Sequence, residues 1–123
     1  MRNTAKVIST ATSIAALLGS LAFSIPAVAQ TEPSAIEQGR AIAFDRKKGN
    51  CLACHQIEGG SLPGNIGPPL IAMKDRFPDK DVLRSQINDS RKSNPATIMP
   101  PFGPHEVLSQ AEIDKVVEFI HSL

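Results

Sequence analysis

The stretch Cys51-Leu52-Ala53-Cys54-His55 contains both cysteines and one of the three histidines of this 123-residue chain. C-x-x-C-H is the attachment motif of c-type haem. Two residues between the cysteines let one helical turn present both thiols to the porphyrin vinyl groups, and the next residue, the histidine, then lies under the iron. The motif predicts one covalently bound haem c and a fold organised around it.

A second axial ligand has to come from a segment that is distant in the sequence. Met99 is followed directly by two prolines, which fix φ and stiffen the loop that would hold a thioether ligand. Met73 is typical of a methionine that fills a gap in the core. His105, in a loop, and His121, which we expect to be solvent-exposed near the chain end, stay open as alternatives. Ligation by His and Met leaves no open position at the iron and favours electron transfer.

A proline-rich loop, Gly67-Pro68-Pro69-Leu70, follows the attachment motif. A ligand histidine needs an acceptor for its second ring nitrogen, and a backbone carbonyl on a rigid loop is a common choice. Proline punctuation of an ordinary loop explains these residues equally well. The spacing alone does not separate the two interpretations.

The N-terminal segment has the pattern of a secretory signal peptide. Arg2 and Lys6 form a positive region, an apolar run covers residues 14–25, and Ala27-Val28-Ala29 matches a small-x-small cleavage site. A retained membrane anchor is the alternative. We expect residues 1–29 to be a cleaved signal peptide, residues 30–123 to form one cytochrome c domain, and the mature protein to be periplasmic without membrane insertion.

Composition limits the remaining function classes. The chain has no Trp and no Tyr, with 13 basic and 12 acidic residues. Such a balance does not favour a nucleic-acid partner, and no basic amphipathic segment marks a membrane surface. A domain of this size has a marginal core, and a buried haem would supply the apolar bulk that large side chains do not.

Helical patterns separated by proline-rich loops predict an all-α fold. A capping box at Ser34 begins a helix that we expect to reach Lys48, and a second at Ser109 begins the last helix. Between them, Asp79 is expected to cap a short helix that buries its apolar face, Val82, Leu83 and Ile87. No alternating strand pattern competes with these helices. A small cytochrome c fold, with crossing terminal helices and loops wrapped around the haem, satisfies this pattern.

Two details of the first helix have both a structural and a functional explanation. Gly39 would allow close approach to the last helix near Phe119, although a helix also tolerates a lone glycine at a cost of about 1 kcal/mol. Arg46, Lys47 and Lys48 would form a cationic rim that steers an acidic redox partner. Their plainer explanation is that cations favour the C-terminal end of a helix.

Four stretches together with the last helix resemble a known family. They are residues 49–55, 62–70, 76–78 and 99–103, and the helix contains residues 112–120. Their combination is similar to SoxX, the X subunit of the periplasmic SoxAX cytochrome complex of the sulfur-oxidation (Sox) system. Some relatives have a long N-terminal extension that we do not expect in this chain, so we expect any contacts made through that extension to be absent or different.

The resemblance implies a role for each residue that matches the family motifs. Cys51 and Cys54 would bind the haem, and His55 and Met99 would be the axial ligands of its iron. The carbonyl of Pro68 would accept from His55. Leu70 would pack on the porphyrin.

The resemblance also implies partners. A SoxA-type subunit, dihaem or monohaem, would form a heterodimer with this chain and carry out the L-cysteine S-thiosulfotransferase-type reaction on thiosulfate and a SoxYZ-type carrier protein. This chain would accept the electrons and pass them to a soluble cytochrome c. It would do no sulfur chemistry itself, because it has no third cysteine and no open ligand position.

Other classes of protein have to be distinguished from a Sox-type electron-transfer subunit. A free-standing monohaem carrier of another respiratory pathway is the main alternative, since His/Met ligation does not name a partner. A thioredoxin-like dithiol would need a βαβ pattern beside C-x-x-C. A zinc site would need further ligands, and a haem gas sensor would need Met99 to leave the iron.

Overall fold

The computed structural model describes residues 32–123, which lie within one compact unit. The predicted signal peptide, its cleavage site and the expected boundary between residues 29 and 30 lie outside the described residues. None of the described helices is long and apolar enough to cross a membrane.

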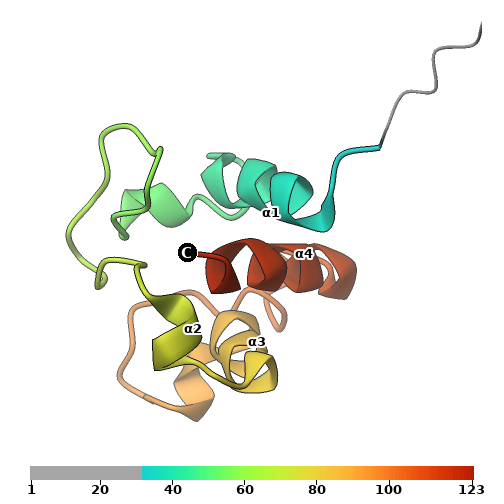
Figure 1. Ribbon diagram of the computed structural model, residues 1–123. Coiled ribbons are helices and arrows are strands. Elements are labelled where there is room, and N and C mark those ends of the chain that lie inside the picture. The colour runs from blue at the N-terminus through green and yellow to red at the C-terminus, as the bar shows by residue number, and fades with distance from the viewer. Residues whose placement is uncertain (1–31) are drawn as a thin grey trace, which may run out of the picture. The chain divides into compact units, whose positions relative to one another are not determined.

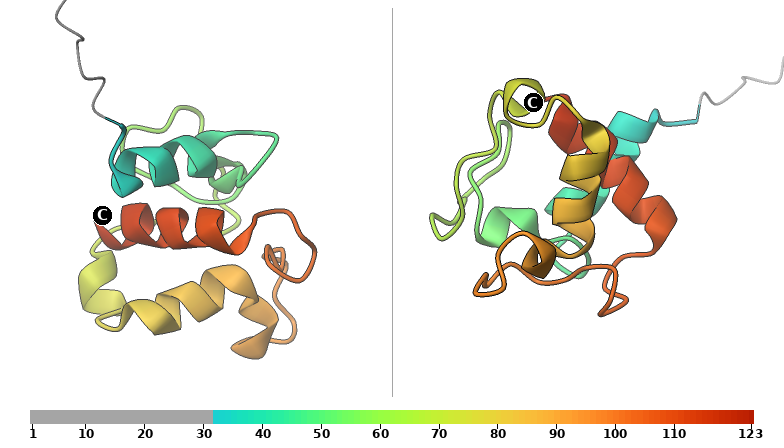
Figure 2. Two further views of the ribbon diagram at one scale, coloured as in Figure 1. Left: turned by 90° about the vertical axis from the view of Figure 1, so that its right-hand side faces the viewer. Right: turned by 90° about the horizontal axis from the view of Figure 1, so that it is seen from below.

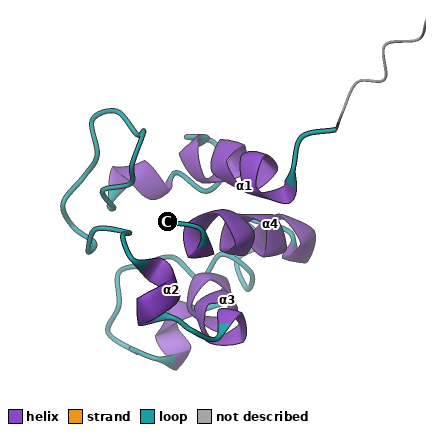
Figure 3. Cartoon of the chain, viewed as in Figure 1, coloured by secondary structure: helices purple, strands orange, loops and turns teal. Residues whose placement is uncertain are grey.

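Six helical segments make up the regular structure of residues 32–123, and no strand occurs among them (Figure 3). They are α1 (Ala35–Phe44), η1 (Cys51–Ala53), α2 (Met73–Arg76), α3 (Lys80–Asn88), η2 (Ser90–Lys92) and α4 (Gln110–His121), where η denotes a 3-10 helix. The predicted all-α cytochrome c fold is confirmed.

The last helix, α4, is the centre of the fold. In Figures 1 and 2, α1 lies along one side of α4 and α3 lies along the other. Three α4 side chains, those of Ile113, Val116 and Ile120, are almost completely buried because neighbours cover α4 on both sides. The loops and short helical segments that connect α1, α3 and α4 form the rest of the described fold.

Close contact between α1 and α4 depends on Gly39. A Cβ at this position would collide with the backbone carbonyl of Lys115 and lie 3.0 Å from the Cβ of Phe119. The rings of Phe44 and Phe119 meet edge to face nearby, with centroids 5.8 Å apart, a favoured aromatic geometry. Gly39 is therefore a packing glycine, as the first of its two explanations predicts.

Both predicted capping boxes are present. The hydroxyl of Ser34 accepts from the N–H of Glu37, and the Glu37 carboxylate accepts from the Ser34 N–H. Ser109 and Glu112 make the same reciprocal pair at the start of α4. Each box satisfies N–H groups that the first turn of a helix leaves without a partner.

The end of α1 differs from the prediction. The helix ends at Phe44 rather than at Lys48, and Asp45 adopts an extended backbone conformation. The Asp45 carboxylate accepts from the N–H of Lys47 at 2.8 Å, and such local side-chain bonds compete with helix formation. The three cations at 46–48 thus lie in a turn after the helix, and the helix-end explanation for them is wrong.

The buried face of α3 is narrower than predicted. Leu83 and Ile87 are buried as expected, but the side chain of Val82 is 54% exposed. Leu83 and Ile87 are four residues apart and share one face, whereas Val82 is rotated about 100° from Leu83 and points away from α4. The Asp79 cap is present, with its carboxylate accepting from the N–H of Asp81 at 2.8 Å.

Candidate functional site

A cavity of about 580 Å³ lies between the helices and the two long loops, and its lining is mostly apolar. Cys51, Cys54, His55 and Met99 all line this one cavity. Its volume falls in the range of about 300–1,000 Å³ that is typical of sites enclosing a small molecule or cofactor. The cavity thus brings together the two thiols, the imidazole and the thioether that the sequence singles out.

Two segments contribute these groups. Residues 51–70, here called the attachment segment, carry the cysteines and His55. Residues 86–102, here called the methionine segment, carry Met99 and run from the end of α3 through η2 into the loop before α4. The remaining lining includes apolar side chains of α2, α3 and α4, among them Met73, Leu83 and Ile120.

Backbone contacts fold the attachment segment. Asn50, in the left-handed conformation with φ 47°, precedes the single turn of η1. The N–H of His55 then donates to the Cys51 carbonyl at 2.9 Å, which closes the turn. Further along, the N–H groups of Gly64 and Gly67 donate back to the carbonyls of this turn at 2.8 Å each. The proline-rich loop is thus tied to the motif by its own backbone.

His55 is oriented by this loop. Its Nδ1 lies 2.8 Å from the carbonyl oxygen of Pro68, so Nδ1 carries the proton and Nε2 is the nitrogen left with a lone pair. Gly67 lies directly against the ring, since a Cβ there would lie 2.6 Å from Nδ1. The imidazole is held between a bonded carbonyl and a close backbone contact.

Leu70 also lines the cavity, and its N–H donates to the Gln56 carbonyl at 2.9 Å. The Arg76 guanidinium donates to the carbonyl of Pro69 at 2.8 Å and also lines the cavity. These contacts fix the end of the attachment segment beside α2.

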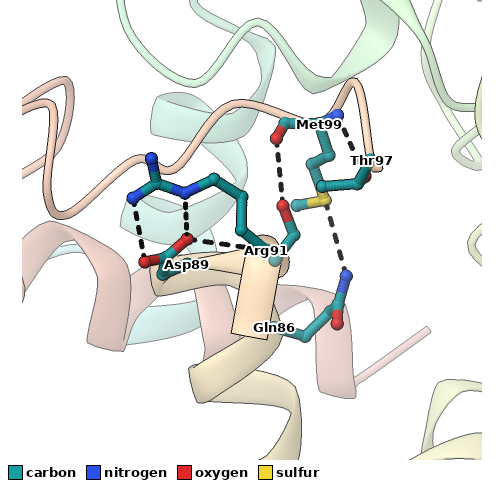
Figure 4. Close-up of polar contacts among 6 residues, drawn as sticks. Gln86, Asp89, Arg91, Thr97 and Met99 are labelled. Carbon is teal, nitrogen blue, oxygen red and sulfur yellow. Dashed lines mark hydrogen bonds and ion pairs between the residues drawn. The ribbon is translucent and has the colours of Figure 1, made fainter. Parts of the chain in front are cut away.

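Side chains, rather than the backbone alone, hold Met99 (Figure 4). The Met99 N–H donates to Oγ1 of Thr97 at 3.1 Å, and its carbonyl accepts from Oγ of Ser90 at 3.0 Å. Nε2 of Gln86, on α3, lies 4.0 Å from the Met99 sulfur. The thioether therefore has a polar neighbour of its own inside the cavity.

The competing ligand candidates are placed differently. Met73 lines the cavity but is only 1% exposed, and its sulfur accepts from the Arg76 guanidinium at 3.4 Å. His105 is exposed, and neither it nor His121 lines the cavity. His121 is half-buried, with Nε2 3.1 Å from the Phe77 carbonyl. The expectation that His121 is solvent-exposed is wrong, because the short helix α2 ends against α4 there.

Cationic side chains lie at the cavity edge. Arg46, Lys47, Lys48 and Arg76 contribute to its lining and are exposed, and their charges suit the carboxylates of a haem. Lys48 also pairs with Glu112 of α4. The Lys48 ammonium, the Ser109 backbone N–H and the Ser109 hydroxyl lower the pKa of Glu112 to about 2. Lys48, one of the three residues of the predicted cationic rim, therefore already forms an ion pair within the protein.

The surroundings of the cysteines do not favour a redox-active dithiol. Cys51 and Cys54 are not joined by a disulfide, and burial raises the pKa of the Cys51 thiol to about 11. Reactive dithiols need a lowered thiol pKa. Within residues 32–123, no three His, Cys, Asp or Glu residues form a group that could hold a metal ion, so a zinc site finds too few ligands there.

The residues present fit a haem. The cavity offers two thiols for thioether bonds, an imidazole with its outer nitrogen already bonded, apolar walls and cations for propionates. Sequence reasoning missed Gln86 and Ser90. The position of Gln86 beside the buried Ile87 gives a weak signal, because a polar residue next to a buried face often lines a site.

Comparisons with known proteins agree with this fit. A family model described as "Cytochrome C oxidase, cbb3-type, subunit III" matches residues 34–120, which is more than half of the chain. The chain belongs to this cytochrome family. It binds one haem c covalently, and the cofactor prediction is confirmed.

One solved structure is similar to this chain over most of its length. The crystal structure of SoxXA from P. pantotrophus contains a chain that is 28% identical, with a TM-score of 0.65. The match covers 73% of this chain and 82% of that chain. The present protein is a SoxX-like monohaem cytochrome, as the sequence resemblance predicts.

A curated relative is similar over a shorter region. An uncharacterized lipoprotein of Aquifex aeolicus is 34% identical over 76 residues. The aligned region is 61% of this chain but only 37% of the lipoprotein. The lipoprotein is therefore much longer than the part that the two proteins share.

Proposed function

We propose that this chain is the electron-transfer subunit of a Sox-type thiosulfate-oxidising cytochrome complex. One observation carries the proposal: a chain that matches most of a SoxXA subunit gathers two thiols, an imidazole and a thioether around one cavity. The chain would take electrons from a SoxA-type subunit and pass them to a soluble cytochrome c.

Each site residue has a defined task in this proposal. Cys51 and Cys54 would anchor the haem through thioether bonds, and His55 and Met99 would bind its iron. Pro68 fixes the His55 tautomer through its carbonyl, and Leu70 covers part of the porphyrin. The 2.8 Å contact between His55 Nδ1 and the Pro68 oxygen supports this assignment.

The haem supplies a one-electron couple when it is bound. His55 and Met99 would both bind its iron, and the apolar lining would exclude water, an arrangement that suits electron transfer rather than substrate binding. Joining a thiosulfate sulfur to a carrier cysteine releases two electrons and a proton. The electrons would leave the A subunit one at a time through this chain, and the chemistry would stay on the A subunit.

The partners and location belong to the same proposal. The SoxA-type subunit binds this chain directly, whereas a SoxYZ-type carrier acts only through that subunit. The protein works in the periplasm after removal of residues 1–29. An exported location is supported by the lipoprotein relative and by haem attachment, which takes place outside the bacterial cytoplasm.

Co-purification and rapid kinetics test the proposal. The mature protein, matured in a host that attaches haem c, should form a heterodimer with the SoxA-type subunit. The complex should then reduce a soluble cytochrome c when thiosulfate and the carrier protein are added. A matched His55→Ala subunit, which lacks the proximal imidazole, should abolish that reduction.

Two results would contradict it. Thiosulfate coupling by the isolated chain would refute the division of labour between the subunits. A haem-loaded chain that exchanges electrons with a soluble cytochrome c but never binds a SoxA-type subunit would instead be a free-standing carrier. The family match, whose description names an oxidase subunit rather than a Sox protein, favours this as the second candidate.

A further inference from the structure

We propose that Gln86 is a positioning residue for the Met99 sulfur and raises the reduction potential of the haem by donating a hydrogen bond to that sulfur. The inference rests on the proposed function, in which Met99 binds the iron. It concerns a residue that plays no part in the sequence motifs and that comes from a different element, α3.

The backbone of Met99 is fixed on both sides. Its N–H donates to Oγ1 of Thr97 at 3.1 Å, and its carbonyl accepts from Oγ of Ser90 at 3.0 Å. Ser90 is 0% exposed, so no water competes for its hydroxyl. With both backbone groups bonded, the Met99 side chain begins from a fixed point and extends into the cavity that it lines.

Gln86 is equally constrained. Leu83 and Ile87 lie on the same face of α3, three residues before and one after it, and both are buried, so α3 cannot rotate without exposing them. Gln86 is half-buried and lines the cavity. Its Nε2 lies 4.0 Å from the Met99 sulfur (Figure 4). Within the described residues this amide is the polar side chain that contacts the sulfur.

A second contact steadies the turn that joins Gln86 to Ser90. The Asp89 carboxylate accepts two bonds from the Arg91 guanidinium, at 2.8 and 3.0 Å, and caps η2 through the Arg91 N–H. Bidentate pairs of this kind fix geometry as well as adding energy. The Asp89–Arg91 pair therefore stabilises the turn that positions the Ser90 hydroxyl and the Gln86 amide around Met99.

The effect of the amide on the potential follows from charge. A thioether sulfur has two lone pairs: one can bind iron and the other can accept an N–H. The amide proton puts a partial positive charge beside the ligand and reduces the electron density that the sulfur can donate. Oxidised iron carries one more positive charge than reduced iron, so this contact disfavours the oxidised form and raises the potential.

Substitution of Gln86 by Met in the haem-loaded mature protein tests the proposal. Gln86→Met keeps the length and helix propensity of the side chain but removes the N–H. The equilibrium constant for reduction against a one-electron reference couple should fall about threefold, which corresponds to about 30 mV at 59 mV per tenfold change. Gln38→Met on α1, which does not line the cavity, is the matched control and should leave the potential unchanged.

The absorption spectrum separates this inference from the proposed function. A sulfur-to-iron charge-transfer band in the oxidised wild type establishes Met99 ligation, and Gln86→Met should keep that band at a shifted position. With the band present, equal potentials for Gln86→Met, Gln38→Met and wild type would overturn only the role of Gln86. Absence of the band from the wild type would overturn the Met99 assignment itself.

A second substitution and a second measurement guard against misfolding. Gln86→Ala, which carries the best helix former, should shift the potential in the same direction. Both variants should also bind added imidazole at the oxidised iron about threefold more weakly, because a sulfur that has lost the N–H donates more electron density and competes more strongly for the iron. An unaltered imidazole affinity in a folded variant that has lost the N–H would count against the contact.

Discussion

The attachment segment and the methionine segment line the same cavity, but they are held in place by different kinds of contact. In the attachment segment, backbone N–H groups at Gly64 and Gly67 bond to carbonyls of the motif turn, and glycine contacts leave no space around His55. In the methionine segment, the hydroxyls of Thr97 and Ser90 hold the Met99 backbone.

The difference shows which kind of group, backbone or side chain, holds each part of the site. The contacts around His55 join residues within 20 positions of each other and depend on glycine and proline rather than on particular side chains. The contacts around Met99 are equally short in sequence, at 2, 9 and 13 residues, but they depend on the side chains of Thr97, Ser90 and Gln86. We therefore expect the first segment to tolerate changes of its non-glycine side chains and the second to be sensitive to the loss of a single hydroxyl or amide group.

Removal of both attachment cysteines should have the largest effect. Without thioether bonds the haem is not retained covalently, and the 580 Å³ cavity loses the group that fills it. Mass spectrometry of Cys51→Ala/Cys54→Ala should give the bare polypeptide mass, with loss of helical circular dichroism. Each single variant keeps one thioether and should retain haem. A colourless double variant that remains fully folded would contradict this dependence on the cofactor.

Gly67→Ala should be a damaging small change at the histidine of the attachment segment. The new Cβ would lie 2.6 Å from Nδ1 of His55, and the ring would have to leave its bond with Pro68. We expect a loss of about 1–3 kcal/mol in the free energy of unfolding, the usual range for overpacking, measured by guanidinium titration of the oxidised protein. Ser61→Ala, on an exposed part of the same loop, should be neutral. Equal free energies of unfolding for Gly67→Ala and Ser61→Ala would contradict the conclusion that backbone contacts hold His55.

Thr97→Val is the corresponding change in the methionine segment. It keeps the shape of the side chain but removes the acceptor for the Met99 N–H, and we expect a cost of about 1 kcal/mol. The oxidised variant should bind added imidazole more tightly, since the sulfur is less well held. The histidine side should be unaffected. An unchanged imidazole affinity would show that the Thr97 hydroxyl is not needed to hold Met99 at the iron.

Glu112 links α4 to the residues just before the attachment segment. Its pKa is about 2, lowered from the ordinary value of 4.5 by Lys48 and the Ser109 cap. Because the folded-state value is the lower one, this carboxylate stabilises the protein above pH 4.5, and the stabilisation is lost as the pH falls from 4.5 towards 2. Glu112→Gln should cost up to about 1 kcal/mol at pH 7, because it removes the charge that pairs with Lys48, whereas the new Gln can still complete the capping box.

The same variant should also flatten the dependence of stability on pH below 4.5, measured by thermal unfolding over that range. Glu118→Gln, which removes the carboxylate of the exposed pair with Lys80, is the control and should change stability by less than about 0.5 kcal/mol. An acid profile that is the same for Glu112→Gln and wild type would show that the Lys48 contact is unimportant.

Lys47→Glu should have the smallest effect on the protein itself and act only on docking. Lys47 is exposed at the cavity edge, and no ion pair is recorded for it within residues 32–123. A cationic rim speeds encounter with an acidic partner, so the reversal should slow electron transfer several-fold at low salt and weaken its salt dependence. Lys74→Glu, at an exposed residue outside the cavity lining, is the control and should leave the rate and its salt dependence unchanged. Unchanged rates for Lys47→Glu would leave the rim without a docking role.

The helices and the main ligand-bearing segment were predictable because their signals are local. The capping boxes at Ser34 and Ser109, the glycine of α1 and the C-x-x-C-H motif each act within a few residues or through one helix face. The end of α1 was not predictable, since the Asp45 turn competes with a helix of similar stability. The half-burial of His121 depends on where α2 meets α4, which periodicity does not encode.

The sequence by itself determined that this protein is a small helical cytochrome c, because two thiols and an imidazole at that spacing have one common use. Only the tertiary structure placed Met99 in the cavity while His105 and His121 lie outside its lining, and only it brought Gln86 and Ser90 to the sulfur-bearing residue. The physical reason is orientation: Gln86 and Ser90 lie within 13 residues of Met99 in the sequence, but their side chains meet it only after α3, η2 and the following loop have packed.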